Sequence, residues 1–153
     1  MIQQILIIIH LAEVTLSDLI LKKIKNVNRI IAFSSSSVIT KKNSRNEKDK
    51  QLVAELLSGE NKLIQYCNIN SINWTIFRPT MIYGANLDEN VTFISNFILK
   101  YHFFPILGKG KGLRQPVHAF DLAQACIQVI RNKDTFNKIY ILSGGEKLTY
   151  LHM

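Results

Sequence analysis

Short apolar runs alternate with helix-length segments along this chain, and that alternation limits the fold more than any other feature. Three runs of the kind that forms buried strands cover residues 5–9, 29–33 and 74–77, and a fourth covers residues 138–142. Between them lie segments of ten or more residues with helical periodicity. Parallel strands need crossovers of this length. The sequence therefore predicts an α/β fold with a mainly parallel sheet flanked by helices.

The first run, residues 5–9, is expected to be a central strand that is apolar on both faces. Helices are expected at residues 15–25, 47–67, 89–100 and 121–131, each with one apolar face turned inward. In the first helix that face comprises Leu16, Leu19, Ile20 and Ile24. Residues 103–107 are expected to be extended, and a final helix is expected to begin near residue 148.

Polar side chains follow the second and third predicted strands. Four serines occupy residues 34–37, and the third strand runs into Arg78 and Pro79, with Tyr83 close behind. Proline cannot donate to a sheet ladder, so this strand is expected to stop near Pro79. Open α/β sheets bind ligands beyond the carboxyl ends of their strands. The serine run is either a site whose hydroxyls bond a substrate carbonyl or alkoxide, or simply a turn.

Glu60 falls near the centre of the apolar stripe of the helix expected at residues 47–67. A carboxylate in that place must be paired or hydrogen-bonded, or its pKa rises. We expect Glu60 to be a structural brace that faces the sheet edge and holds Arg78 or the serine loop. Arg78 then either forms this ion pair or binds a phosphate or carboxylate ligand. Gly59 beside it suggests either close packing or a distortion of the helix.

Arg114 and His118 are two further candidates. Arg114 follows a glycine-rich turn and either clamps a diphosphate or is simply exposed. His118 is either a binding residue or an ordinary loop histidine. The turn itself, Gly108-x-Gly-x-Gly, lacks the Gly-x-Gly-x-x-Gly spacing and the strand–helix context of a dinucleotide fingerprint.

The chain has 153 residues, of which 47% are hydrophobic and 20% charged, with a formal net charge of +8. Because the cations are spread along the sequence, neither nucleic acid nor a membrane is expected as a partner. No apolar run is long enough to span a bilayer. Cys67 and Cys126 are expected to be buried free thiols of a cytoplasmic protein. The four histidines lack metal-site spacing.

Together these segments resemble the NAD-dependent epimerase/dehydratase family, the extended short-chain dehydrogenase/reductases. Residues 5–12 resemble the fourth Rossmann strand with its His-Leu-Ala loop, and residues 29–38 the fifth strand with its active-site serine. Residues 74–84 resemble the sixth strand. Residues 112–123 resemble the Arg…Val-His-Val-x-Asp-Val-Ala segment, and residues 139–146 a segment of the substrate region.

The resemblance implies a single partial NAD(P)-binding, Rossmann-like domain over residues 1–153, with residues 85–120 and 138–153 contributing a small substrate-binding region. The cofactor would be NAD or NADP, and the substrate a small polar or nucleotide-activated molecule such as a nucleotide sugar. Ser36 would be the catalytic serine, and Arg114 and His118 would bind substrate. The implied cofactor-binding residues are Leu11, Ala12, Ser34, Ser35, Arg78, Pro79 and Tyr83.

Two parts of the family pattern are missing. The glycine-rich first βαβ unit, which cradles the pyrophosphate, is not in this sequence, so the chain looks truncated. No tyrosine is followed by a lysine four residues later, and in the family that pair manages the proton. Three interpretations stay open: an oxidoreductase of this family, a non-catalytic nucleotide-binding or scaffold protein, and an inactive gene fragment. An exposed sheet edge would also favour association with a second copy.

Overall fold

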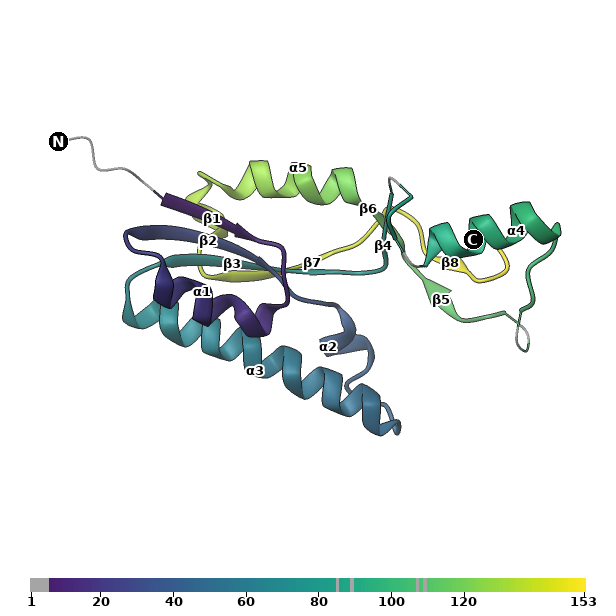
Figure 1. The fold of residues 1–153 in the computed structure, drawn as a ribbon, viewed down its shortest axis with the longest axis horizontal. Helices are drawn as coiled ribbons and strands as arrows, with labels where there is room; N and C mark the ends of the chain where they lie inside the picture. Colours follow the sequence, from purple (N-terminus) through teal and green to yellow (C-terminus); the bar gives the residue numbers. More distant parts are fainter. Residues whose placement is uncertain (1–5, 85, 89, 107, 109) are drawn as a thin grey trace. The chain divides into compact units, whose positions relative to one another are not determined.

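The computed structural model describes residues 6–84, 86–88, 90–106, 108 and 110–153. The chain divides into two compact units, which are described one at a time (Figure 1). Unit 1 comprises Met1–Arg78 with Ala125–Ile141, and unit 2 comprises Pro79–Gln124 with Leu142–Met153.

Unit 1 is built on a four-stranded sheet with the order β1-β2-β3-β7. Strands β1, β2 and β3 pair in parallel, with Ile9 opposite Ile31 and Phe33 opposite Phe77. The predicted α/β fold with a mainly parallel, Rossmann-like sheet is therefore confirmed. The strands are β1 (Leu6–His10), β2 (Val27–Phe33), β3 (Asn73–Pro79) and β7 (Lys138–Leu142).

Helices cover both faces of this sheet. Figure 1 shows α1 and α3 on one face and the unit 1 part of α5 on the other. The longest, α3, begins where the Asn46 side chain accepts the backbone N–H of Lys48, a normal N-cap. The helical segments are the 3₁₀ turn η1 (Val14–Leu16), α1 (Ser17–Lys23), α2 (Ser37–Thr40), α3 (Glu47–Ile69), α5 (Ala119–Val129) and the 3₁₀ turn η2 (Lys133–Thr135).

The core of unit 1 lies between the sheet and the inner faces of α1 and α3. It includes Leu21 from α1, Ile30 and Ile76 from the sheet, and Leu63 and Cys67 from α3. Gly59 lets α3 approach η1 closely, because a Cβ at this position would lie 2.8 Å from the Thr15 backbone nitrogen. This confirms the close packing expected there.

A second buried group is cationic. Arg29, 3% exposed in β2, pairs with no carboxylate of the described residues. Its Nη2 donates to Thr75 Oγ1 (2.6 Å) and to the Val129 carbonyl (3.3 Å), and its guanidinium lies 4.4 Å from the centre of the Phe136 ring. Burial lowers the pKa of Arg29. These bonds tie the end of α5 and the following turn to the middle of the sheet.

Two expectations for the start of the chain are wrong. In the described part of the chain β1 is an edge strand, and its Leu6 and Ile9 are 39% and 43% exposed rather than buried; residue 5 lies outside the described residues. The inner face of α1 also differs. Because η1 precedes the helix and α1 begins only at Ser17, the buried residues are Val14, Ser17 and Leu21, whereas Leu16, Leu19 and Ile24 are exposed.

Among its described residues, unit 2 contains two small strand pairs, one complete helix and the first residues of α5. Strand β4 (Ile82–Tyr83) pairs in parallel with β6 (Val117–His118), and β5 (Leu113–Arg114) pairs antiparallel with β8 (Leu148–Thr149). The helix is α4 (Val91–Tyr101), and none of its residues is fully buried. The final helix expected near residue 148 is wrong, because β8 occupies that place. Residues 103–106 form no strand, and residues 89 and 107 lie outside the described residues.

Cys67 and Cys126 are free and buried, as predicted. Burial raises the pKa of the Cys67 thiol to about 12 and also raises that of Cys126. Among the described residues, none of the helices combines the length and apolarity that crossing a membrane requires.

The contact at Gly59 predicts that Gly59→Ala destabilises the chain. The new methyl group would press on the backbone of η1, and we expect a net loss of about 1–2 kcal/mol in the free energy of unfolding despite the better helix propensity of alanine. Ser58→Ala, on an exposed position of the same helix, is the matched control and should be neutral or slightly stabilising. Urea unfolding measures both; equal stability of the two variants would contradict the close contact.

Candidate functional site

The carboxyl ends of β1, β2 and β3 meet at one edge of the unit 1 sheet. Leu11 and Ala12 follow β1, Ser34 follows β2, and Arg78 is the second-to-last residue of β3. The Ser34 amide donates to the Phe77 carbonyl at 2.7 Å, which places Ser34 beside Arg78. The structure therefore brings these four predicted residues to the same edge.

Ser34 carries a buried polar group at this edge that lacks a partner. Its Oγ is buried and makes no hydrogen bond with any described residue. Buried hydroxyls are nearly always hydrogen-bonded, so an unpaired one at a strand end is suited to a ligand. Leu11 adds an apolar surface, since 73% of it is exposed.

The next three serines form the turn into α2. Ser35 Oγ accepts a hydrogen bond from the Ser37 backbone N–H and donates one to Ser37 Oγ, both at 3.1 Å. The Ser36 carbonyl accepts the amide of Thr40 and the Thr40 hydroxyl. The serine run is thus a turn at Ser35–Ser37, as one alternative held. Within this run, Ser34 alone has a buried hydroxyl that makes no hydrogen bond with a described residue.

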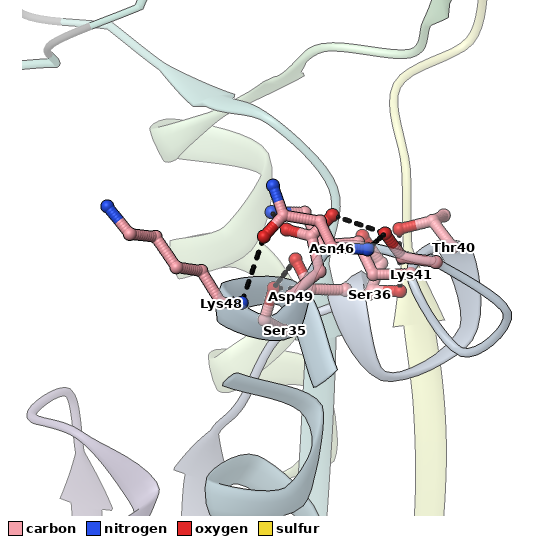
Figure 2. A network of polar contacts seen from close by, with 9 residues as sticks. Ser35, Ser36, Thr40, Lys41, Asn46, Lys48 and Asp49 are labelled. Atoms are coloured by element: carbon pink, nitrogen blue, oxygen red, sulfur yellow. Dashed lines mark hydrogen bonds and ion pairs between the residues drawn. The ribbon is translucent and has the colours of Figure 1, made fainter. Parts of the chain in front are cut away.

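A polar network that the sequence did not reveal supports this turn from the side of α3 (Figure 2). Asp49, in the first turn of α3, accepts bonds from Lys41 Nζ and from Ser44 Oγ, each at 2.8 Å. The bond from Lys41 holds the pKa of Asp49 below its usual range. The network connects the segment after α2 to the start of α3, and so fixes the connection that leaves the serine turn.

Glu60 and Arg78 form the ion pair that the sequence suggested. Arg78 Nε donates to Glu60 Oε1 at 2.9 Å, and Nη2 donates to Glu60 Oε2. Glu60 is 2% exposed, and its hydrogen bonds raise the pKa of Arg78. Two of the three guanidinium nitrogens are therefore committed to the carboxylate. Arg78 braces the strand end, and it does not fit the alternative role of a phosphate clamp.

The predicted residues of unit 2 lie around a separate feature, where Tyr83 and His118 are neighbours across the β4–β6 pair. Their rings meet edge to face, with centroids 5.1 Å apart. His118 Nδ1 accepts the Phe120 amide at 3.2 Å, so the neutral ring carries its proton on Nε2. Gly84 has φ +133°, and a Cβ there would lie 2.8 Å from His118 Nε2.

A cavity of about 350 Å³ opens beside this pair, lined by Tyr83, Val91, Pro116, His118, Asp121, Gly144, Gly145, Glu146, Leu148 and Met153. Arg114 is not among the lining residues. Its Nη1 donates to the Leu113 carbonyl, and its guanidinium lies 4.8 Å from the centre of the Tyr150 ring.

Pro79 is buried and ends β3, where the strand was expected to stop.

Asp88 was missed by the sequence analysis although it organises this part of unit 2. Its carboxylate accepts the amides of Gly84 (3.2 Å), Asn90 (3.2 Å) and Thr92 (2.9 Å), and also the Thr92 hydroxyl (2.8 Å). The Thr92 amide contributes most to lowering the pKa of Asp88 well below its ordinary value. The available signal was an acidic residue just before a helix, a common capping pattern.

No group of three His, Cys, Asp or Glu in the described ranges could hold a metal ion.

Comparison with known proteins decides the family. The model of the NAD-dependent epimerase/dehydratase family matches residues 5–142. The chain belongs to the NAD-dependent epimerase/dehydratase family. A curated relative, NADH dehydrogenase [ubiquinone] 1 alpha subcomplex subunit 9 of Arabidopsis thaliana, is 33% identical over 76 residues, which are 49% of this chain and 19% of that protein.

Solved structures of family members share the fold. UDP-glucose 4-epimerase of Thermotoga maritima, with UDP-glucose, superimposes with a TM-score of 0.75 at 20% identity, over 95% of this chain and 58% of that one. UDP-glucuronic acid 4-epimerase of Bacillus cereus, with UDP-glucuronic acid and NAD, gives 0.73 at 20% identity, over 91% and 47%. This epimerase/dehydratase chain thus spans about half the length of these structures.

The residues at the unit 1 edge fit one end of NAD. The unpaired Ser34 hydroxyl and the exposed Leu11 and Ala12 suit a flat ring that carries an amide. Arg78 is held by Glu60 and offers little to a phosphate. The unit 1 edge therefore fits the nicotinamide end and not the pyrophosphate.

Removing the Glu60 charge is predicted to destabilise unit 1. Glu60→Gln leaves the Arg78 guanidinium partly buried without its counter-charge, so we expect a loss of about 3 kcal/mol in the free energy of unfolding. Lys50→Met in the same helix breaks an exposed pair with Glu47 and should cost about 0.5 kcal/mol or less. Urea unfolding of both variants tests this, and a Glu60→Gln chain as stable as the Lys50→Met chain would refute the brace.

Asp88 is predicted to make the stability of unit 2 sensitive to acid. The pKa of Asp88 in the folded chain lies below its value near 4 in the unfolded chain. The stabilisation that Asp88 gives to the folded state is therefore fully present above about pH 4, and it is lost as the pH falls through the pKa of the folded chain. Asp88→Asn should therefore lower the melting temperature at neutral pH, with the difference from wild type shrinking as the solution is acidified. The exposed Asp134→Asn is the control. A difference that stays constant with pH would speak against this account.

Proposed function

We propose that the carboxyl edge of β1, β2 and β3 forms the nicotinamide-side wall of a dinucleotide site, in a protein that binds NAD or NADP without transferring hydride. The observation that carries this proposal is the sequence of α3. This helix, Glu47–Ile69, spans most of the connection between the serine turn and β3, and its one tyrosine, Tyr66, is followed four residues later by Asn70. A Tyr-x-x-x-Lys pair is therefore missing from the segment that would carry it.

The side chains of unit 1 support binding better than chemistry. NAD(P), when bound, would supply a nicotinamide ring that can accept or donate hydride. Ser34 and the Leu11–Ala12 loop would hold that ring, and Ser36 could bond a substrate carbonyl. Glu60 is committed to Arg78, so it cannot act as the general base that a hydride transfer from an alcohol requires.

The curated relative suggests what such a protein does. It is named as a subunit of a mitochondrial NADH dehydrogenase, and we propose by analogy that this chain is an accessory subunit of a larger assembly. Co-purification of NADH dehydrogenase activity with the tagged chain supports this role. The two free thiols suit a reducing compartment. We propose the cytoplasm, so the analogy with the mitochondrial relative extends to the role of a subunit and not to the location. Fractionation of cells expressing the tagged chain distinguishes the cytoplasm from the mitochondrion.

A second candidate is an oxidoreductase or epimerase that acts on a nucleotide sugar. The cavity beside Tyr83 and His118 favours it, because a phenol and an imidazole there could bond sugar hydroxyls. The epimerase structures with UDP-glucose and UDP-glucuronic acid agree with a substrate of this class. Arg114 lies outside the cavity lining, which leaves the binding of the phosphates without a cation there.

Titration of the chain with NADH and NADPH separates these functions. Trp74, the one tryptophan of the chain, is 7% exposed in β3 and reports binding by energy transfer to the reduced nicotinamide. We expect saturable binding, no turnover of UDP-glucose, and an affinity about three- to tenfold lower for Ser34→Ala, because one hydrogen bond is lost. Ser58→Ala is the control. Absence of binding would overturn the site, and turnover would favour the second candidate.

A further inference from the structure

Helix α4 of unit 2 carries an aromatic face that is largely exposed among the described residues. Phe93, Phe97 and Tyr101 are spaced by four residues and stack along the helix, with ring centroids 6.2 Å and 4.7 Å apart. Phe103, just beyond the helix, meets Phe97 edge to face at 5.8 Å. Phe93, Tyr101 and Phe103 are nevertheless 59%, 48% and 60% exposed. These four side chains are called the α4 aromatic face.

From the middle of α4 onward the charged residues of this part of the sequence have one sign, whereas the Asp88 carboxylate bonds the amide of Thr92 at the start of the helix. Residues 90–120 contain Lys100, Lys109, Lys111 and Arg114 and not one aspartate or glutamate. Lys100 Nζ lies 5.0 Å from the centre of the Tyr101 ring, at the border of the α4 aromatic face. Lys111 and Arg114 are exposed as well. Exposed aromatic rings with a lysine at their border, followed in the sequence by further exposed cations, suit a partner that is both apolar and anionic.

We propose that the α4 aromatic face docks on the surface of an anionic lipid bilayer. Aromatic rings partition into the boundary between headgroups and acyl chains, while neighbouring lysines and arginines contact lipid phosphates. At 11 residues, α4 is far too short to span a bilayer and would lie in its plane. A second copy of this chain suits the face poorly, because it would bring a second set of cations against the first.

The inference concerns residues of unit 2 only, and it does not depend on dinucleotide binding. It differs from the expectation, drawn from the spread of charge over the whole chain, that no membrane takes part. The whole-chain average concealed a segment in which every charge is positive. An accessory subunit of a membrane-bound assembly and a free peripheral protein would both have use for such a surface.

Co-sedimentation of the full chain with vesicles tests the proposal. We expect binding to vesicles of phosphatidylcholine mixed with phosphatidylserine, little binding to phosphatidylcholine alone, and weaker binding as salt is raised. The double variant Phe93→Ser/Tyr101→Ser should lose at least tenfold in partitioning. Lys100→Glu should lose about fivefold for each unit of charge changed near the surface.

The control is Ile39→Ser/Ile69→Ser, which removes two unit 1 side chains that are 48% and 74% exposed. It should bind vesicles like wild type, and circular dichroism and melting curves show whether each variant is folded. No binding to anionic vesicles, equal binding to both kinds of vesicle, or an equal loss in the control would each overturn the proposal. So would a dimer, found by light scattering, that Phe93→Ser/Tyr101→Ser dissociates, because a second copy would then cover the face.

Discussion

The ion pair between Glu60 and Arg78 is the interaction on which the site edge of unit 1 depends. A carboxylate that is 2% exposed is tolerated inside an apolar stripe because two guanidinium nitrogens neutralise and hydrogen-bond it. The same pair fixes the end of β3 against the middle of α3, and the Ser34 amide then bonds to the neighbouring Phe77 carbonyl. The unpaired Ser34 hydroxyl therefore lies at a strand end whose neighbour, Arg78, is held by a charge buried on α3.

Structural features could be predicted from the sequence where one strong local effect decides the structure. The strands at residues 29–33, 74–77 and 138–142, the stop at Pro79 and the pairing of Glu60 follow from apolar runs, proline chemistry and the cost of a buried charge. The edge position of β1 depends on which strands pair with it, and the face of α1 depends on the preceding 3₁₀ turn. The periodicity of the sequence predicts neither the edge position of β1 nor the inner face of α1. It also does not predict the strand β8 or the hydrogen bonds of Asp88.

The site residues divide in a similar way. Topology brought Leu11, Ala12, Ser34 and Arg78 to one edge, because parallel strands of one sheet end together. Which of these groups remains free for a ligand could not be read from the sequence. Ser35 and Ser37 satisfy each other, Arg78 is held by Glu60, and Ser34 is left without a partner. The family resemblance assigns these residues to the cofactor. In this chain, however, only some of them have polar groups that are free to bind it.

The most direct test of the dinucleotide site is an NMR titration of the ¹⁵N-labelled chain with nicotinamide mononucleotide, which carries the ring that the unit 1 edge is proposed to hold. The account predicts that the amide signals of Leu11, Ala12, Ser34 and Arg78 shift together and saturate, while those at the far ends of β2 and β3, such as Arg29 and Asn73, stay in place. Saturable shifts confined to unit 2 residues such as Tyr83 and His118, or no shifts at the strand ends, would contradict it.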